Sequence, residues 1–158
     1  MDAGFEKRAT DNKPEPKTLR QMEPFSRDEL QLIRAWFRIK DATTRDRALL
    51  ETGVDSMLRC GDLVRLKVDD VRDFNGAIHK QFKIATQKTG ETVTVGLTDK
   101  TRTLLSMLLT QDNKWGVDYL FTPLGKPHGG HISEVTLRKL VKEWARAAHL
   151  NPGNYSGH

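Results

Sequence analysis

The sequence predicts a mainly α-helical fold with a small antiparallel β-sheet on one edge (α+β). Apolar residues recur at helical spacing before residue 67 and after residue 103, and several of these segments begin at a Ser or Thr suited to a helix N-cap. Between them, residues 77–86 and 91–95 are short β-favouring runs joined by the turn sequence Gln87-Lys88-Thr89-Gly90. The 158 residues suffice for one core, and no internal repeat divides them.

Residues 1–24 are expected to form a flexible arm or linker, because they contain three prolines and almost no apolar periodicity. A single domain is then predicted over residues 25–158. It begins with a helix, since Ser26 and Glu29 form a capping-box pattern in which each side chain bonds the other residue's amide. The apolar face of this helix extends to about residue 39.

The middle of the chain is predicted to hold a second helix, a short helical segment and the hairpin. The second helix starts at Thr43 or Thr44 and loosens near Thr52-Gly53. The chain re-enters helix around residues 63–66, and residues 71–74 are a candidate third strand beside the hairpin.

Two further helices are predicted around a short buried segment at residues 118–121. Thr98 caps the first of these helices and Ser133 caps the second. The second has an apolar face at i, i+3, i+4, i+7, i+8 and i+11, made by Leu137, Leu140, Val141, Trp144, Ala145 and Ala148. The three tryptophans, Trp36, Trp115 and Trp144, are all predicted to lie in the core.

The composition argues against a membrane protein, a secreted protein and a disordered chain. Charged residues make up 30% of the sequence and apolar residues 37%, the mean hydropathy is -0.60, and no stretch approaches about 18 consecutive apolar residues. The first 25 residues lack the apolar core of a signal peptide. Cys60 is the single cysteine, which suits a reducing compartment. We therefore expect a cytoplasmic protein.

The positive charge is concentrated in two blocks. Residues 58–102 and residues 126–158 each carry a net charge of +3, whereas the other segments carry zero or -1. With a pI near 9.4, this favours a polyanionic partner such as nucleic acid. An RNA-binding α/β protein is disfavoured, because no pair of exposed aromatic residues marks the strands for base stacking.

Two cations have no evident structural role. Arg59 lies close to Gly61, and Lys88 lies at the tip of the predicted hairpin, so both are expected to reach a phosphate. The alternatives are that Arg59 forms an ordinary surface ion pair with Asp62 or Asp55, and that Lys88 is only solvated. His128 and His131 hint at a metal site, but no carboxylate or cysteine with ligand spacing accompanies them.

Four signals occur in an order that resembles the catalytic domain of the tyrosine recombinases, the family of phage and mobile-element integrases. One of them is Tyr119-Leu120-Phe121-Thr122-Pro123 with the helix after Ser133, which resembles the segment that leads to the family's second box. Arg59-Cys60-Gly61-Asp62-Leu63 is similar to the family's first box, and Gln87-Lys88-Thr89-Gly90 resembles the hairpin that carries its catalytic lysine. Gly157-His158 stands where the second box, His-x-x-Arg, begins. The resemblance covers roughly residues 18–158.

The resemblance implies a site-specific DNA recombinase or integrase that cleaves and rejoins duplex DNA through a 3'-phosphotyrosyl intermediate. Arg59 would bind the non-bridging phosphate oxygens, and Lys88 would protonate the leaving 5' oxygen. His158 would assist as a third catalytic residue, and Asp62 would support Arg59. The resemblance also implies a place in the bacterial cytosol or nucleoid, self-association on DNA, and no metal, cofactor or small-molecule substrate.

The family's second arginine and its nucleophilic tyrosine are expected beyond His158, so the chain is expected to be a catalytic domain truncated at its C-terminal end and inactive alone. Tyr119 belongs to the predicted buried segment, and Tyr155 precedes the second box, so neither is expected to replace the nucleophile. The alternative is a non-catalytic DNA-binding module derived from a recombinase, in which the phosphate site only binds.

Overall fold

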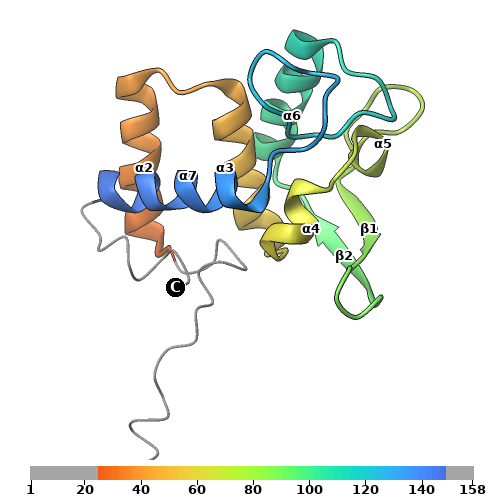
Figure 1. Ribbon diagram of the computed structural model, residues 1–158, viewed down its shortest axis with the longest axis horizontal. Coiled ribbons are helices and arrows are strands. Elements are labelled where there is room, and N and C mark those ends of the chain that lie inside the picture. The colour runs from red at the N-terminus through yellow and green to blue at the C-terminus, as the bar shows by residue number, and fades with distance from the viewer. Residues whose placement is uncertain (1–24, 149–158) are drawn as a thin grey trace, which may run out of the picture.

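The computed structural model describes residues 25–148, which form a mainly helical fold with one two-stranded antiparallel sheet (Figure 1). The predicted fold class is therefore confirmed. The helices are α2 (Arg27–Lys40), α3 (Thr44–Ser56), α4 (Cys60–Val64), α5 (Val68–Val71), α6 (Asp99–Asp112) and α7 (Glu134–Ala147), and the strands are β1 (Gln81–Ala85) and β2 (Thr92–Gly96). The predicted arm at residues 1–24 lies outside the described residues.

The helix α2 begins at the predicted capping box and packs against α7. The Ser26 amide donates to Glu29 Oε1 at 2.7 Å, and the Glu29 amide donates to Ser26 Oγ at 3.1 Å. Phe37 of α2 meets Trp144 of α7 edge to face, with ring centroids 5.6 Å apart. Since Trp144 is fully buried, these two rings fix one side of the core.

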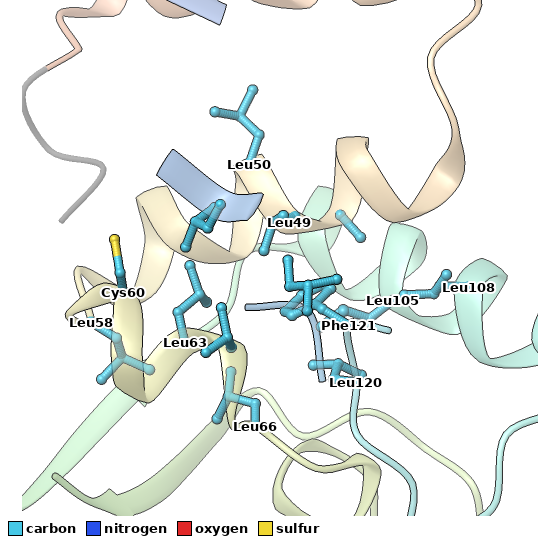
Figure 2. Packing of buried hydrophobic residues seen from close by; sticks show 14 of the residues in the cluster. Leu49, Leu50, Leu58, Cys60, Leu63, Leu66, Leu105, Leu108, Leu120 and Phe121 are labelled. Atoms are coloured by element: carbon cyan, nitrogen blue, oxygen red, sulfur yellow. The ribbon is translucent and has the colours of Figure 1, made fainter. Parts of the chain in front are cut away.

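The helix α3 lies at the centre of the core. Its Leu49 and Leu50 are fully buried, and Figure 2 shows Leu49 on the side of the helix that faces the leucines of α4 and α6, whereas Leu50 points away from them. The helix continues to Ser56, so the predicted loosening near Thr52-Gly53 is wrong. Both Thr52 and Gly53 are buried in a helix that packs along α6, and this tertiary packing outweighs their low helix propensity.

The hairpin lies at the end of the molecule away from α2, beside α4 (Figure 1). Phe82 of β1 pairs with Val95 of β2, and both side chains are buried. Both strands fall within or close to the predicted runs. The third strand predicted at residues 71–74 is wrong, because Val71 ends the helix α5 and only an isolated bridge between Arg72 and Ile78 follows.

The loop after α6 is held by a buried lysine. The side chain of Lys114 is fully buried, and its Nζ donates to Thr122 Oγ1 at 3.0 Å and to the Pro127 carbonyl at 2.6 Å. Burial lowers the pKa of Lys114 against the opposing effect of nearby acids. Trp115 beside it is 60% exposed and stacks on the ring of His128, so its predicted place in the core is wrong.

The segment at residues 118–121 is buried as predicted, with Leu120 and Phe121 fully enclosed. It bonds back to the chain after α4, since the Leu120 amide donates to the Leu66 carbonyl at 2.7 Å. Among the described helices, none combines the length and the apolar character needed to span a bilayer.

Candidate functional site

A groove of about 250 Å³ separates the end of α3 and the start of α4 from the hairpin. It brings Arg59 and Lys88 together, although 29 positions separate them in the sequence. The residues that line it are Ser56, Met57, Leu58, Arg59 and Asp62 on one side, and Thr86, Lys88, Thr89, Glu91, Val93 and Thr94 on the hairpin.

Arg59 is positioned by an extended link between two helices. Met57 ends α3 in a left-handed conformation with φ of 54°, and Arg59 is the N-cap of α4 with extended backbone angles. The neighbours of Arg59, Leu58 and Cys60, are buried at 4% and 5% exposure. These apolar anchors on both sides hold the link, and the Arg59 side chain, which makes no capping bond, lines the groove.

Lys88 lies on a turn that hydrogen bonds keep in one shape. The Gly90 amide donates to the Thr86 carbonyl at 2.8 Å, and the hydroxyls of Thr86 and Thr89 lie 2.9 Å apart. Gly90 has φ of +75°, a conformation that glycine adopts without strain. The turn therefore presents an exposed Lys88 at its tip, as the sequence predicted.

Asp62 joins the two sides of the groove. Its carboxylate is 6% exposed, and Oδ1 accepts a hydrogen bond from the Gln87 amide at 2.9 Å. The sequence placed Asp62 as a support for the Arg59 guanidinium. The structure instead gives the carboxylate to the residue that precedes Lys88, because the hairpin turn reaches α4 at this point. Asp62 thus connects α4 to the hairpin tip.

Within residues 25–148, neither Arg59 nor Lys88 has an ion pair or a side-chain hydrogen bond. The alternative in which Arg59 pairs with Asp62 or Asp55 is therefore wrong for the described part of the chain. Asp55 is used elsewhere, since its Oδ2 accepts from the amide and the hydroxyl of Thr98 at 2.9 and 3.0 Å. Glu91 also lines the groove without pairing to either cation. Two cations thus face one groove with their donors unused.

Several polar residues that the sequence analysis did not single out border α4. The Arg65 Nη1 donates to the Gly61 carbonyl at 2.8 Å and lies 3.8 Å from Glu134 of α7. Arg138 lies 3.9 Å from the same carboxylate, on the other oxygen. The i, i+4 spacing of Glu134 and Arg138 was visible in the sequence, but their approach to Arg65 depends on the packing of α7 against α4.

Cys60 plays no chemical part in this groove. It is buried at 5% exposure, and burial, with the charge of Glu134, raises the pKa of its thiol to about 11. A thiol with this pKa stays protonated near neutral pH and is a poor nucleophile. The prediction of an inert small residue is consistent with this.

The remaining tyrosine and histidine candidates lie elsewhere or outside the described residues. Tyr119 does not line the groove, and its half-buried ring meets His131 edge to face at 5.0 Å. His128 Nδ1 lies 2.6 Å from Asp118 Oδ2, and His131 Nδ1 lies 2.6 Å from the Ile132 carbonyl. His158 and Tyr155 are beyond residue 148, so the structure does not place them.

The metal-site alternative for the two histidines gains no support from the geometry. Each has its own partner, and residues 25–148 contain no group of three His, Cys, Asp or Glu side chains placed to hold a metal ion. The groove at Arg59 is lined by one guanidinium and one ammonium, and its two carboxylates, Asp62 and Glu91, belong to no such group.

Comparison with known proteins supports what this geometry and the motif order suggest. The family model described as the Phage integrase family matches residues 24–158. The chain belongs to the phage integrase family. No curated protein sequence matches it.

Among solved structures, this integrase-family chain is similar to the crystal structure of XerA recombinase, with a TM-score of 0.60 and 18% sequence identity. The match covers 83% of this chain and 46% of the XerA chain, so the chain spans less than half the length of XerA. At this identity the likeness shows a shared fold. Arg59 and Lys88 therefore lie on a recombinase fold, on two elements that the fold brings side by side.

Proposed function

We propose that this chain forms part of the DNA-cleaving core of a site-specific recombinase, and that its groove holds the phosphodiester to be cut. The observation that carries the proposal is the meeting of two unpaired cations, Arg59 and Lys88, in one groove of an integrase-family fold. A phosphate placed between them would take the hydrogen bonds that the described chain leaves unused. Duplex DNA is the substrate that the family suggests.

The two side chains have different tasks in this proposal. The Arg59 guanidinium donates two parallel hydrogen bonds to the non-bridging oxygens, where negative charge grows in the transition state. A tyrosine hydroxyl gives its proton to a base, the role open to His158, and its oxygen forms a bond to phosphorus while the bond from phosphorus to the 5' oxygen breaks. Lys88 gives its proton to that leaving oxygen, which becomes a hydroxyl. The 5' hydroxyl of a second DNA strand later attacks the phosphotyrosyl bond, which joins the strands and releases the tyrosine.

Asp62 sets the distance between the two cations. Its hydrogen bond to the Gln87 amide fixes the residue before Lys88 against the helix that begins after Arg59. We assign it a positioning role, since its buried carboxylate acts on the hairpin tip and not on DNA. This differs from the direct support of Arg59 that the sequence suggested.

The proposal takes no nucleophile from the described residues. Tyr119 is the one tyrosine among them, and it packs on His131 with the Lys67 ammonium 5.4 Å from its ring centroid. His158 keeps its proposed role as a third group at the phosphate, carried over from the family resemblance. Self-association on DNA also stays a prediction, and the stoichiometry of complexes on one duplex tests it.

The discriminating experiment uses the leaving group, in an active recombinase that contains this chain. Lys88→Ala should cleave ordinary DNA slowly and should recover on a substrate whose bridging 5' oxygen is replaced by sulfur, because a thiolate leaves without a proton. Arg59→Ala is the matched control, and it should stay slow on both substrates. An equal relative loss for Lys88→Ala on both substrates would show that Lys88 is not the general acid.

A non-catalytic DNA-binding module is the second candidate. It is favoured by the absence of any tyrosine from the groove within residues 25–148. Both readings place no nucleophile among the described residues, and incubation of the 158-residue chain with a DNA suicide substrate, followed by denaturing electrophoresis, tests this shared expectation. We expect no covalent band through Tyr119. A band that disappears in Tyr119→Phe would overturn our placement of the nucleophile outside the described residues.

A further inference from the structure

A basic cleft of about 340 Å³, separate from the groove at Arg59, lies between α2, α3 and α6. It shares no lining residue with the groove at Arg59. The residues that line it are Arg34 and Arg38 from α2, Arg47 and Glu51 from α3, and Lys100, Thr103 and Leu104 from α6. Four cationic side chains thus face one carboxylate.

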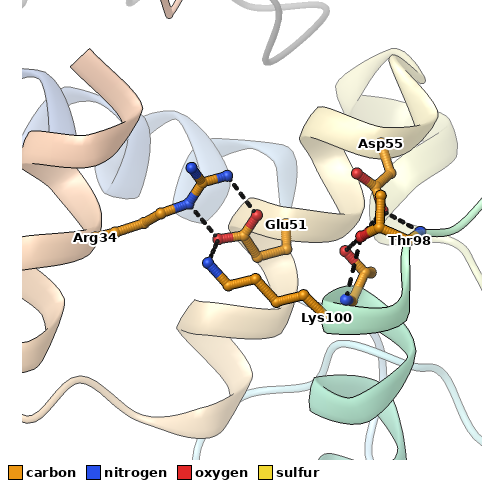
Figure 3. A network of polar contacts seen from close by, with 6 residues as sticks. Arg34, Glu51, Asp55, Thr98 and Lys100 are labelled. Carbon is orange, nitrogen blue, oxygen red and sulfur yellow. Dashed lines mark hydrogen bonds and ion pairs between the residues drawn. The ribbon is translucent and has the colours of Figure 1, made fainter. Parts of the chain in front are cut away.

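The carboxylate of Glu51 is already satisfied within the chain (Figure 3). Arg34 binds it with two hydrogen bonds, from Nε at 2.7 Å and from Nη2 at 2.8 Å, and Lys100 Nζ lies 3.2 Å from the same group. Glu51 is 5% exposed, so the pair is held away from solvent. The Glu51 carboxylate therefore pairs with two of the four cations. The residues that line the cleft carry a net charge of +3.

The other two arginines supply donors without a buried acid. Arg47 is held in place by its bonds to the Ala42 and Phe37 carbonyls at 3.0 and 3.2 Å. Its nearest acid, Asp41, is 3.7 Å away, and that carboxylate is 99% exposed. Arg38 is exposed, and its side chain has no hydrogen bond or ion pair within residues 25–148. Arg38 therefore contributes charge to the cleft without contributing a contact to the fold.

Guanidinium groups that converge on one cleft match the tetrahedral oxygens of a phosphate, because each presents parallel N–H donors. We propose that this cleft is a second phosphate-binding site, which holds a backbone phosphate of DNA away from the reacting phosphodiester. The assignment of DNA as the source of that phosphate rests on the proposed function. The Glu51 carboxylate keeps Arg34 and Lys100 in place when the site is empty.

The two sites lie along the same helix. Arg47, Glu51 and Asp55 are spaced by four residues, so they share one face of α3. From Glu51 to the helix end at Ser56 the axial rise is about 7.5 Å, and the extended link to Arg59 adds at most about 10 Å. The backbones at Glu51 and Arg59 are therefore at most about 18 Å apart, which is roughly five base-pair steps of duplex.

The contact between Asp55 and Thr98 lies at the boundary of the two sites. Asp55 precedes Ser56, which lines the groove, and Thr98 lies between Thr94 of the groove and Lys100 of the cleft. Both hydrogen bonds from Thr98 go to Asp55 Oδ2, so this carboxylate is directed onto the start of α6. The two sites are therefore adjacent, and our proposal requires one duplex to contact both of them.

The test compares Arg38→Gln with Arg27→Gln in the full 158-residue chain. Both arginines are exposed on α2 and lack side-chain partners among the described residues, and only Arg38 lines the cleft. Affinity is measured for a duplex of about 20 base pairs, which at 3.4 Å per step spans both sites. Arg38→Gln should weaken binding roughly fivefold and reduce the slope of log affinity against log salt by about 0.9. Arg27→Gln should bind as the wild type does, and both should unfold at the wild-type temperature.

Two further measurements separate this inference from the proposed function. If Arg59→Gln weakens duplex binding while Arg38→Gln and Arg27→Gln bind equally well, the second site is refuted and the proposed function stands. Inorganic phosphate is the second probe, followed at the Arg38 Nε–H resonance, which Arg38→Gln identifies by its loss. If the chain binds no duplex but phosphate shifts that resonance, the cleft takes a free phosphate group and the proposed function fails. No response to either probe would refute both.

Discussion

The groove at Arg59 and the cleft at Arg34 are both lined by arginine, and they differ in whether a buried carboxylate pairs with the arginine. Arg34 is paired to Glu51 through two hydrogen bonds, whereas Arg59 has no acid partner in the described chain. The pair with Glu51 makes Arg34 a link between helices α2 and α3. Because Arg59 has no such partner in the described chain, its N–H donors are available for an external anion. Arg34 thus stabilises the contact between two helices, whereas we propose that Arg59 binds a phosphate.

The largest expected effect is on catalysis at the unpaired arginine. In an active recombinase that contains this chain, Arg59→Ala should slow DNA cleavage on the order of 100-fold or more, because it removes donors aimed at the developing phosphate charge. Single-turnover cleavage assays measure this. The unfolding temperature should not change, since the Arg59 side chain has no partner in residues 25–148.

Arg59→Lys sharpens the same prediction. It keeps the charge but loses the planar fork of donors, so it should recover only a small part of the rate. Full recovery by lysine would show that charge alone matters at this position. If Arg59→Ala lowered the free energy of unfolding as much as loss of the pair between Arg34 and Glu51 does, the contrast between Arg59 and Arg34 would be wrong.

The next effect is on stability at the paired arginine. Glu51→Gln should lower the free energy of unfolding by about 2 kcal/mol, because the amide cannot accept both hydrogen bonds from Arg34 and leaves a partly buried guanidinium without its counter-ion. Denaturant titration measures the change. Glu29→Gln is a suitable control, since the amide keeps its capping role at an exposed helix start. An unchanged midpoint for Glu51→Gln would remove the structural role of the pair.

A smaller effect is expected at Asp62, which belongs to the groove but acts through the hairpin. Asp62→Ala should reduce the cleavage rate about tenfold, because the Gln87 amide loses its acceptor and Lys88 is no longer held at one distance from Arg59. Asp62→Asn keeps an oxygen acceptor and should retain most of the rate. If the loss in Asp62→Ala is equal on ordinary and 5'-thio substrates, Asp62 does not act through Lys88.

The smallest effect is a pH dependence of stability that comes from Glu51. Burial acts to raise its pKa, but the hydrogen bonds and charge of Arg34, together with Lys100, outweigh burial and hold the pKa below its ordinary value of 4.5. A lowered pKa stabilises the folded state above the unfolded pKa, and the contribution disappears as pH falls from about 4.5 through the folded value. Denaturant titrations across this range should show a shallower acid loss in Glu51→Gln than in the wild type.

Sequence reasoning located the parts of the fold that depend on local signals. The capping box at Ser26 and the apolar spacing of α7 are set by residues within one or two turns of each other, and the structure has both. The turn that carries Lys88 is likewise local, because Gly90 supplies the positive φ that it needs. The family motifs then placed Arg59 and Lys88 in the same groove.

Features that depend on distant partners were missed. The exposure of Trp115 depends on the burial of its neighbour Lys114 against the Pro127 carbonyl, which no periodicity reveals. The partner of Asp62 is 25 residues away, so the nearer Arg59 was the natural choice from spacing alone. The pairing of Arg34 with Glu51 crosses from one helix to the next, and neither residue belongs to a motif.

Lys88 at the hairpin tip and Lys114 after α6 should differ sharply in their reactivity toward amine-acylating reagents. Amine acylation requires an accessible, unprotonated nitrogen, and the Lys114 ammonium is fully enclosed with its donors committed to Thr122 and Pro127. Its lowered pKa does not help a reagent that has no path to it. Lys88 stands exposed at the hairpin tip. Acylation followed by mass spectrometry should therefore modify Lys88 rapidly and should modify Lys114 only when the loop after α6 opens. A ligand in the groove should protect Lys88 from acylation.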